Sequence, residues 1–369
     1  MKAPLYVFAG GGTGGHLAPG IAVAEQLRLE QPDCRIRFVG SGRPVEQQML
    51  EPTGFEYVAR ETLPLTAIRR RPFRFLASHW TAFRDARQFI QTDRPAAVIG
   101  LGGFASVPFT LAARRCGVPC VLLEQNTVPG KANRWLTRWH PICLTFDDSA
   151  RYLSRKAVSH VTGNPLRVDV CHIAAGHRVI SVDRPTLLVL GGSLGSKQVN
   201  VSVLNAVEQC ASEFAGWRIV HQTGPEGADT ARSLYSRLGI AHEVAPFFAD
   251  LPARLANATL AIARAGATTL AELAAVGIPA VLIPYPTAAD DHQASNAQLF
   301  VKAGGAVVAV SLDRSFKPVE LVPVLKPLLE NPQQLLSMSQ AMRTLARPNA
   351  AADVVAILKS LIDQQAVRR

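Results

Sequence analysis

The sequence predicts an α/β protein with two doubly wound, Rossmann-like domains, each a parallel sheet with helices on both faces. Three observations support this fold class: short apolar runs alternate with helical patterns, the alternation restarts after Asn164-Pro165, and glycine-rich segments follow several of the runs. Strands of a parallel sheet are buried on both faces, so they lack the polar alternation of half-exposed strands. A chain of 369 residues can bury a core in each of two domains.

The expected strands are the apolar runs between the helical patterns. They are residues 5–9, 36–39, 97–100, 118–123 and 142–146 in the first half, and residues 186–190, 217–222, 242–245, 260–263, 280–283 and 307–310 in the second. Apolar residues at helical spacing between residues 350 and 362 predict a closing helix. This order of elements is typical of parallel sheets wrapped by helices.

The domain boundary is expected near residues 162–165, where a glycine and a residue before proline interrupt regular structure. We therefore expect an N-terminal domain over residues 1–166, a C-terminal domain over 167–345, and a C-terminal helix over 346–369. The polar stretch 167–184 is expected to link the two domains. The sequence leaves open whether the last helix stays on the second domain or packs back on the first.

Composition excludes several classes of protein. Hydrophobic residues make up 48% of the chain and charged residues 18%, which excludes a disordered or collagen-like chain. The six cysteines lack paired spacing and indicate reduced thiols, and we expect no export signal. The longest uncharged stretch, between Arg94 and Arg114, is interrupted by glycines and Pro108. It therefore predicts a strand, a turn and a helix start rather than a membrane span.

The net charge of +11 predicts an anionic partner, which could be a phosphate compound, anionic lipid or nucleic acid. Residues 68–87 combine arginines with aromatic residues, among them Trp80 and Phe83, a mixture that suits the headgroup region of a membrane. The same pattern also fits an amphipathic helix whose apolar side lies in the core. No recognised nucleic-acid-binding module accompanies the charge, so we expect no nucleic-acid partner.

The first glycine-rich segment, residues 9–16, follows the first expected strand and precedes a helix expected to begin near Leu17. Glycines let the backbone turn sharply and let a ligand approach main-chain N–H groups at a helix N-terminus. Gly10, Gly12 and Gly15 also satisfy the dinucleotide-binding fingerprint, but the second strand ends without the carboxylate that this fingerprint requires. A purely structural turn is the other alternative.

Similar glycine-rich segments lie at residues 100–106 and 190–196, each directly after an expected strand. Loops at the carboxyl edge of an open α/β sheet are where ligands bind. Three such loops in two domains predict a cleft between the domains. Each loop taken singly is also compatible with a tight turn.

The segment from Arg264 to Glu272 follows an expected strand and begins a helix. Small residues and threonines at a helix N-terminus offer N–H and hydroxyl donors to a diphosphate, and Arg264 would add charge. Glu272, one turn into the helix, is expected to accept hydrogen bonds from the vicinal hydroxyls of a ribose. Compensation of the helix dipole is the alternative role for this carboxylate.

Residues 290–297 group carboxylates and amides on a loop and the start of a helix. Such groups suit sugar hydroxyls, which need several directed donors and acceptors at once. A metal site is the rival interpretation, but Asp290, Asp291 and His292 are contiguous, and adjacent residues rarely converge on one cation. We expect no metal here, and helix capping by the aspartates remains an alternative.

Several motifs occur in the order found in one known family. They are Gly-Gly-Thr-Gly-Gly-His at 11–16, Gly102-Gly103-Phe104, Glu124-Gln125-Asn126, Thr162-Gly163-Asn164-Pro165-Leu166-Arg167, Gly191-Gly192-Ser193, the segment 264–272, and Asp291-His292-Gln293 with Asn296-Ala297. From residue 9 to residue 310 the chain resembles the MurG family of peptidoglycan N-acetylglucosaminyltransferases. The resemblance implies a GT-B glycosyltransferase that moves N-acetylglucosamine from UDP-N-acetylglucosamine to the lipid-linked acceptor lipid I and forms lipid II.

The resemblance also implies donor binding on the second domain, acceptor binding on the first, and inversion at the sugar carbon without a metal or cofactor. It implies a peripheral protein on the cytoplasmic face of the bacterial inner membrane, in contact with the anionic surface through residues 68–87. Other GT-B transferases, with sterol, antibiotic or diacylglycerol acceptors, are the nearest alternatives. A nicotinamide oxidoreductase and a non-catalytic lipid- or nucleic-acid-binding protein are more distant ones.

The resemblance assigns binding residues position by position. They are Thr13, Gly14 and Gly15 for the transferred sugar or its phosphates, Asn126 and Gln293 for the sugar, Arg167 and Ser193 for the diphosphate region, backbone groups of Phe248 for uracil, and Ala267, Thr268, Thr269, Leu270, Ala271 and Glu272 for diphosphate and ribose, with Arg264 and Asn296 as further candidates. His16 is the candidate general base, because an imidazole at the first glycine-rich loop suits proton transfer near neutrality. Helix capping or sugar binding by His16 is the alternative.

The chain departs from the family pattern at four positions. Leu123 stands where the family often has His, Phe104 where it often has Tyr, and Leu194 and Ser196 where Gln and Ala are common. We expect these replacements to remove polar groups near the predicted cleft. They put in doubt a catalytic hydroxyl at position 104 or an imidazole at position 123.

Overall fold

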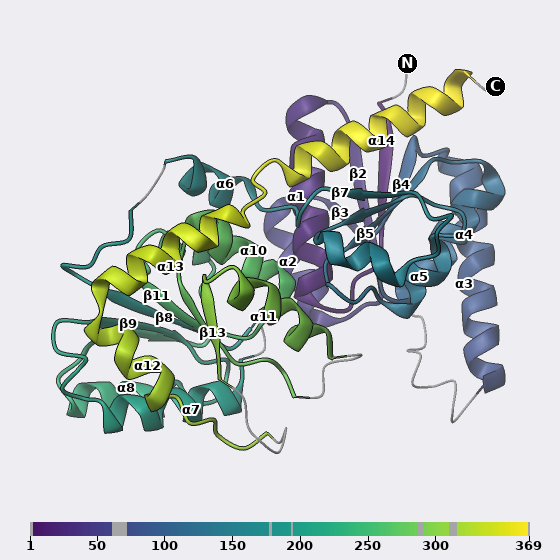
Figure 1. Ribbon diagram of the computed structural model, residues 1–369. Coiled ribbons are helices and arrows are strands. Elements are labelled where there is room, and N and C mark those ends of the chain that lie inside the picture. Colours follow the sequence, from purple (N-terminus) through teal and green to yellow (C-terminus); the bar gives the residue numbers. More distant parts are fainter. Residues whose placement is uncertain are drawn as a thin grey trace. The chain divides into compact units, whose positions relative to one another are not determined.

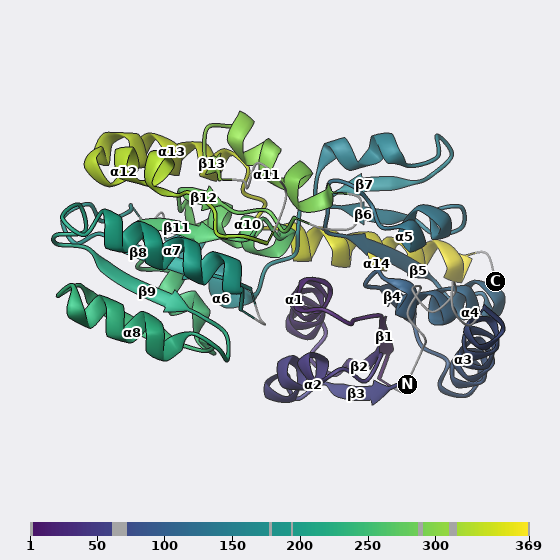
Figure 2. The same cartoon turned by 90° about the horizontal axis from the view of Figure 1, so that it is seen from below.

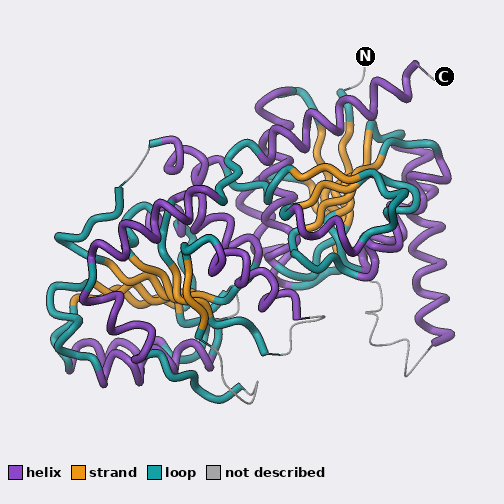
Figure 3. The backbone as a smooth tube through the Cα atoms, in the orientation of Figure 1, coloured by secondary structure: helices purple, strands orange, loops and turns teal. Residues whose placement is uncertain are grey.

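The computed structural model describes residues 3–60, 72–176, 179–192, 195–286, 291–309 and 316–367 (Figure 1). The chain forms two compact units, the first made of Met1–Val168 and Arg347–Arg369 and the second of Asp169–Ala346. Each unit holds one parallel sheet, and Figure 3 shows the strands of each sheet enclosed by helices. The predicted fold class is confirmed.

Within the described residues, the first unit contains a seven-stranded parallel sheet in the order β3-β2-β1-β4-β5-β6-β7. Its strands are β1 (Leu5–Ala9), β2 (Arg35–Gly40), β3 (Glu56–Ala59), β4 (Ala97–Gly100), β5 (Cys120–Glu124), β6 (Ile142–Leu144) and β7 (Ser159–Val161). The five predicted strands are confirmed, with ends that differ by at most two residues. The sequence did not predict β3 and β7, because these short edge strands are partly exposed and carry no continuous apolar run.

Helices cover both faces of this sheet (Figure 2). They are α1 (Gly14–Glu30), α2 (Pro44–Leu50), α3 (Pro72–Asp93), α4 (Val107–Cys116), α5 (Lys131–Leu136) and α14 (Ala350–Val367), with short 3-10 turns at Glu51–Thr53, Phe104–Ser106 and Asp147–Tyr152. Side chains alternate along β1, so Tyr6 and Phe8 pack under α1 and α14 while Leu5 and Val7 pack under α3 and α4. The alternation builds two hydrophobic cores from one strand.

The C-terminal helix α14 packs on the first unit. Its Val354, Val355 and Leu358 are buried in the core beneath α1. Lys359 pairs with Glu30 of α1 at 2.5 Å. The chain therefore leaves the first unit after Val168 and returns to it at Arg347.

The second unit has a six-stranded parallel sheet in the order β10-β9-β8-β11-β12-β13 among the residues that the structure describes. Its strands are β8 (Thr186–Leu190), β9 (Arg218–Gln222), β10 (Ala241–Ala245), β11 (Leu260–Ala263), β12 (Ala280–Leu282) and β13 (Ala306–Val308). All six strands predicted for this half are confirmed, with end positions shifted by no more than two residues. Residue 310, the last of the predicted runs, lies outside the described residues.

The helices of the second unit also lie on both faces of its sheet. They are α6 (Val168–Ala175), which begins at the boundary, α7 (Lys197–Gln209), α8 (Ala228–Arg237), α9 (Leu251–Leu255), α10 (Ala267–Val276), α11 (His292–Lys302), α12 (Val322–Glu330) and α13 (Pro332–Thr344). In Figure 1, α7 and α8 lie below the sheet and α10 and α13 above it. The stretch expected to link the domains thus contains a helix, α6, anchored by the buried Val170.

Two local predictions have different outcomes. The uncharged stretch between Arg94 and Arg114 folds as β4, a 3-10 turn and α4, as expected, and none of the described helices is long and apolar enough to cross a membrane. The prediction that the first helix begins near Leu17 is wrong. Thr13 takes the N-cap position with extended backbone angles, so α1 already begins at Gly14.

A buried polar network supports the second sheet. The ring of His221 on β9 contacts the Tyr235 hydroxyl through Nδ1 at 2.9 Å and the Asn200 side-chain oxygen through Nε2 at 3.2 Å. Asn200 in turn donates to the Thr223 carbonyl at 2.9 Å. Burial lowers the pKa of His221 to about 3, so this imidazole is neutral in the folded protein.

We predict that Leu358→Ala lowers the free energy of unfolding by about 2–5 kcal/mol, because it leaves a cavity where α14 meets the core. Urea unfolding of the purified protein measures this change. Ser360→Ala, on the exposed side of the same helix, should change the free energy by less than about 0.5 kcal/mol. Equal effects of the two variants would show that α14 does not stabilise the first unit through burial.

We predict that His221 makes the second unit less stable in acid. An unfolded histidine binds a proton below a pH of about 6.5, whereas the folded group does not until a pH of about 3. Stability should therefore fall as the pH drops from about 6.5, with a slope of up to about 1.4 kcal/mol per pH unit from this group. Urea unfolding between these pH values should show a shallower slope for His221→Gln than for the wild-type protein; identical slopes would contradict the assignment.

Candidate functional site

In each sheet the strand order changes direction at one point, between two neighbouring strands. Glycine-rich loops follow both of these strands in the first unit and one of them in the second. The change lies between β1 and β4 in the first unit and between β8 and β11 in the second. All strands within a sheet are parallel, so the loops after them gather at its carboxyl edge. Ligands of open α/β folds bind at this position.

The two glycine-rich loops of the first unit touch each other. Gly10 has a φ of 124°, and a Cβ at this position would lie 2.8 Å from the Gly102 carbonyl oxygen. Gly102 also has a positive φ, 95°, and its backbone packs against the ring of His16. Only glycine satisfies both the backbone angles and the spacing.

Thr13 and His16 form a pair at the start of α1. The Thr13 hydroxyl lies 2.9 Å from His16 Nδ1, so the hydroxyl contacts the ring instead of capping a backbone N–H of the helix. Thr13 is exposed and His16 is half-buried. Gly14 and Gly15 lie in the first turn between them. The structure thus brings four of the predicted site residues together on one helical turn.

A buried glutamate, Glu46 of α2, holds the loops after β1 and β2. Its carboxylate accepts hydrogen bonds from Gly12 N, from Ser41 N and Oγ, from the N–H groups of Gly42 and Arg43, and from the Tyr57 hydroxyl at 2.6 Å. Burial alone would raise the pKa of Glu46, but these hydrogen bonds outweigh it and hold the pKa below its ordinary value. The carboxylate is therefore ionised at neutral pH.

A second buried glutamate, Glu124 at the end of β5, orients Asn126. Glu124 Oε1 accepts from the Asn126 backbone N–H at 3.1 Å, and Oε2 accepts from Gly130 N and from the Asn133 amide at 2.9 Å each. Burial raises the pKa of Glu124 against the effect of these bonds. Asn126, predicted to contact the sugar, is thus held at the carboxyl edge of the first sheet.

In the second unit, α10 starts directly after β11. Gly266 is the N-cap in an extended conformation, and Ala267, Thr268 and Thr269 form the first turn. The side chain of Leu270 is fully buried, so only its backbone can reach a ligand. Glu272 is also buried, while Ala271 is partly exposed.

The guanidinium of Arg264 is hydrogen-bonded to the loops around the start of α10. Its guanidinium donates to the Ser196 hydroxyl at 2.7 Å, to the Gln198 side chain at 2.9 Å and to the Ile283 carbonyl at 3.0 Å. Burial lowers its pKa to about 10, which leaves it charged at neutral pH. Arg264 therefore fixes the loops after β8 and β12. Ser196 also caps α7, so our expectation that a replacement here removes a polar group is wrong.

Three further predicted residues have internal partners. The Phe248 backbone N–H donates to the Gln222 side chain at 3.0 Å, so this N–H is already engaged. Gln293 accepts from Tyr285 N at 2.9 Å. Asn296 is fully buried and donates to the Ala265 carbonyl at 3.2 Å, which fixes the turn before α10.

One residue predicted for the diphosphate region lies in the first unit, and several predicted positions lie outside the described residues. Arg167 is half-buried at the end of the first unit, after β7. Ser193, Leu194 and Asp290, and the arginine-rich start of the basic segment at residues 68–71, lie outside the described residues. In the described part of the chain, no group of three or more His, Cys, Asp or Glu side chains could hold a metal ion.

Sequence reasoning missed the residues that orient the loops. Glu46, Glu124 and Gln222 each hold a loop at a carboxyl edge, yet none was predicted as a site residue. Glu46 carries one readable signal, because it is the third residue of a helix that begins with Pro44, the position of the acidic partner in a capping box. The contacts of Glu46 with Gly12 and of Gln222 with Phe248 join segments far apart in the chain, which no local pattern encodes.

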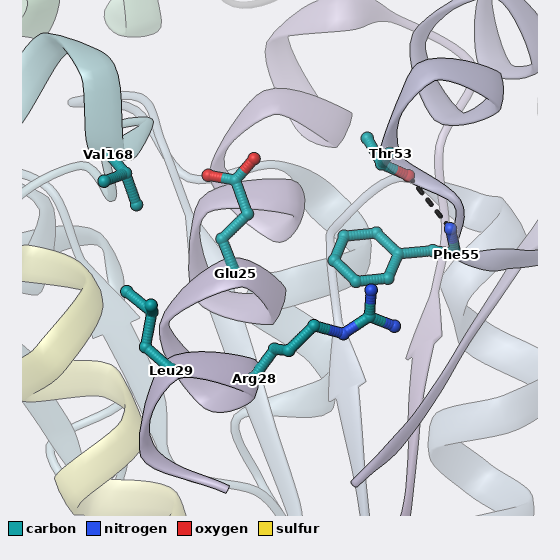
Figure 4. Close-up of a pocket in the computed structure, with 6 residues that line it drawn as sticks. All are labelled: Glu25, Arg28, Leu29, Thr53, Phe55 and Val168. Atoms are coloured by element: carbon teal, nitrogen blue, oxygen red, sulfur yellow. Dashed lines mark hydrogen bonds between the residues drawn. The ribbon is translucent and has the colours of Figure 1, made fainter. Parts of the chain in front are cut away.

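A cavity of about 260 Å³ lies at the opposite edge of the first sheet (Figure 4). Its walls include Arg28 and Leu29 near the end of α1 and Phe55 just before β3. The Arg28 guanidinium lies 4.5 Å from the centre of the Phe55 ring, a cation–π contact. Because this is the amino edge of the sheet, the cavity is separate from the glycine-rich loops.

Comparisons with known proteins match this arrangement. The glycosyltransferase family 28 N-terminal domain matches residues 6–141, and the C-terminal domain of the same family matches residues 186–354. The crystal structure of Acinetobacter baumannii MurG has a TM-score of 0.75 with 29% sequence identity, and the similarity covers 97% of this chain and 99% of that one.

Two curated relatives carry the same name, UDP-N-acetylglucosamine–N-acetylmuramyl-(pentapeptide) pyrophosphoryl-undecaprenol N-acetylglucosamine transferase. The relative from Syntrophotalea carbinolica is 38% identical over 97% of this chain and 99% of its own length. The relative from Desulfotalea psychrophila is 36% identical over 97% of each chain. The chain therefore belongs to the MurG family of N-acetylglucosaminyltransferases, within glycosyltransferase family 28, and has the GT-B fold.

Proposed function

We propose that this protein transfers N-acetylglucosamine from UDP-N-acetylglucosamine to the 4-hydroxyl of the muramyl residue of lipid I, undecaprenyl-pyrophosphoryl-MurNAc-pentapeptide, and so forms lipid II. The observation that carries the proposal is the similarity, over nearly the whole chain, to relatives named for this transfer. Glycine-rich loops at the carboxyl edges of both sheets support it, because they suit a diphosphate and a sugar.

The donor is proposed to bind on the second unit. The N–H groups of Ala267, Thr268 and Thr269 would meet the diphosphate at the positive end of α10, and Glu272 would accept from the ribose hydroxyls. Gln293 would bind the sugar through its amide NH₂, since its oxygen already accepts from Tyr285 N. Phe248 would contact uracil through its carbonyl, and Arg264 and Asn296 would act by fixing the loops.

The acceptor is proposed to bind on the first unit, with His16 as general base. The 4-hydroxyl oxygen would attack the anomeric carbon, its proton would pass to His16 Nε2, and the bond to the β-phosphate would break to release UDP with inversion. This role requires the other ring nitrogen, Nδ1, to carry a hydrogen and donate it to Thr13 Oγ1, 2.9 Å away. Thr13 would thus select the tautomer of the base, while Gly15 and Asn126 would contact the sugar.

The reaction is proposed to need no metal ion or cofactor. Negative charge develops on the β-phosphate as the bond to the sugar breaks. The N–H groups at the start of α10 are fixed by the helix, so they can stabilise this charge without reorganising. Ser193 and Arg167 would add to this stabilisation as further donors.

The protein is proposed to dock on the anionic surface of the cytoplasmic membrane through α3. Phe73, Leu76 and Trp80 are 86%, 61% and 63% exposed, and with the exposed Arg84 and Arg87 they follow one stripe of the helix. Another side of the helix, with Ala86 and Ile90, is buried in the core. An apolar stripe flanked by arginines suits a lipid headgroup region.

We expect acceptor-dependent release of UDP from UDP-N-acetylglucosamine with a short-chain lipid I analogue, at an unchanged rate in EDTA, and a β-linked disaccharide product. Coupled UDP detection and analysis of the product measure this. UDP-sugar binding without release would point to a different acceptor. No binding of the UDP-sugar would contradict the proposed activity, and loss of activity in EDTA that added Mg²⁺ restores would contradict the metal-free mechanism.

We expect the double variant Phe73→Ser/Trp80→Ser to lose most of its affinity for vesicles with anionic lipid, because each buried aromatic side chain contributes about 1.5–3 kcal/mol of apolar burial. Vesicle sedimentation measures binding. The variant should keep its activity with a water-soluble acceptor. The matched control is Leu29→Ser. It replaces an exposed apolar residue on a different helix, α1, and should bind vesicles normally. Equal binding of all three proteins would exclude α3 as the docking surface.

A further inference from the structure

Glu46 is the most heavily hydrogen-bonded carboxylate described in the first unit. Its side chain is fully buried and accepts from six donors on three segments: the loop after β1, the loop after β2, and β3. A buried carboxylate without partners would be very unfavourable, so this one is tolerated only because every donor is in place. The donors and the carboxylate therefore fix each other.

This network reaches the proposed base through Gly12. Glu46 accepts from the Gly12 N–H, and Arg43 donates to the Gly12 carbonyl at 2.8 Å, so α2 and its N-cap hold both polar groups of this residue. Gly12 has a φ of 88° and is followed by Thr13, the N-cap of α1. The direction in which Thr13 and His16 leave the loop is thus set by contacts from α2.

The fit around the carboxylate leaves no room for other side chains. A Cβ on Gly11 or Gly40 would overlap the Glu46 carboxylate, which explains a glycine at each position. The carboxylate also stands near the end of β2, where a dinucleotide-binding fold uses an acid to hold a ribose. Glu46 comes six residues after β2 and not at its end, and its carboxylate is occupied by protein donors, so it holds the loop and does not bind a ribose.

We propose that Glu46 is a positioning residue for the transfer reaction: through Gly12 it holds Thr13 and His16 in the geometry that proton removal from the acceptor requires. This inference rests on the proposed function and adds a residue that touches neither substrate. Its carboxylate is needed as an acceptor only, because all six partners donate. An amide in its place would direct its NH₂ group at backbone N–H groups and disrupt the loop.

The first test compares Glu46→Gln with the matched control Glu56→Gln. Glu56 lies on the neighbouring strand β3 and pairs with Arg37 at 2.7 Å, but it is half-exposed and does not contact the loop. Glu46→Gln should lower kcat by roughly 10- to 100-fold with KM for UDP-N-acetylglucosamine changed by less than about twofold, because the diphosphate, ribose and uracil of the donor are proposed to bind the second unit. Glu56→Gln should leave both constants unchanged.

The second test separates positioning of His16 from a general loss of structure. In a double-mutant cycle with His16→Ala, Glu46→Gln should cause little further loss of kcat, since both changes remove the same function. Additive losses, or a Glu46→Gln protein that behaves like Glu56→Gln, would overturn the inference. If Glu46→Gln does not fold, Tyr57→Phe removes one donor to the same carboxylate and should show a smaller loss that is again non-additive with His16→Ala.

The wild-type protein is assayed first with UDP-N-acetylglucosamine and the short-chain lipid I analogue. No acceptor-dependent UDP release by the wild type would overturn the proposed function, and this inference with it. Normal release by the wild type with no effect of Glu46→Gln would overturn the inference alone.

Discussion

Parallel strand pairing is the constraint on which the rest of this structure depends. Every strand in a sheet points the same way, so the chain must cross back between successive strands, in most cases through a helix, and every strand ends at the same edge. The central strands are buried on both faces, which fixes their apolar sequences and their helical cover. The polar and glycine-rich segments are left for the carboxyl edge, where a loop after β1 can touch a loop after β4.

Buried polar and charged side chains hold these loops in place. Glu46 and Glu124 in the first unit and Arg264 in the second each make several hydrogen bonds to the loops around them. Such groups cost free energy to bury and are stabilised by their hydrogen bonds, so the loops cannot shift without leaving a buried polar group unpaired. The proposed functional groups, the Thr13–His16 pair and the first turn of α10, lie beside these rigid anchors. Loops held by buried side chains keep the neighbouring functional groups fixed, which suits catalysis that relies on fixed dipoles.

The sequence was informative wherever burial or local geometry leaves a pattern in consecutive residues. Most of the eleven predicted strands were found because both of their faces are buried, and the glycine-rich loops because positive φ angles require glycine. The edge strands β3 and β7 were missed because they need no apolar run, and the start of α1 was misplaced because Thr13, rather than a residue beyond the glycines, takes the N-cap. Prediction failed at these two edge strands and at the partly exposed start of one helix.

By itself, the sequence determined the fold class, the family and the segments from which a site could be built, because apolar runs, glycines and motif spacing are local properties of the chain. Only the tertiary structure decided which polar groups are already engaged: Arg264 binds the loops around it, the Phe248 N–H binds Gln222, and Glu46 is surrounded by donors from three segments. The physical reason is that a hydrogen bond depends on distance in space. Several of these partners lie many residues away, as Gly12 does from Glu46 and Ser196 from Arg264, and only the pairing of strands brings them into contact.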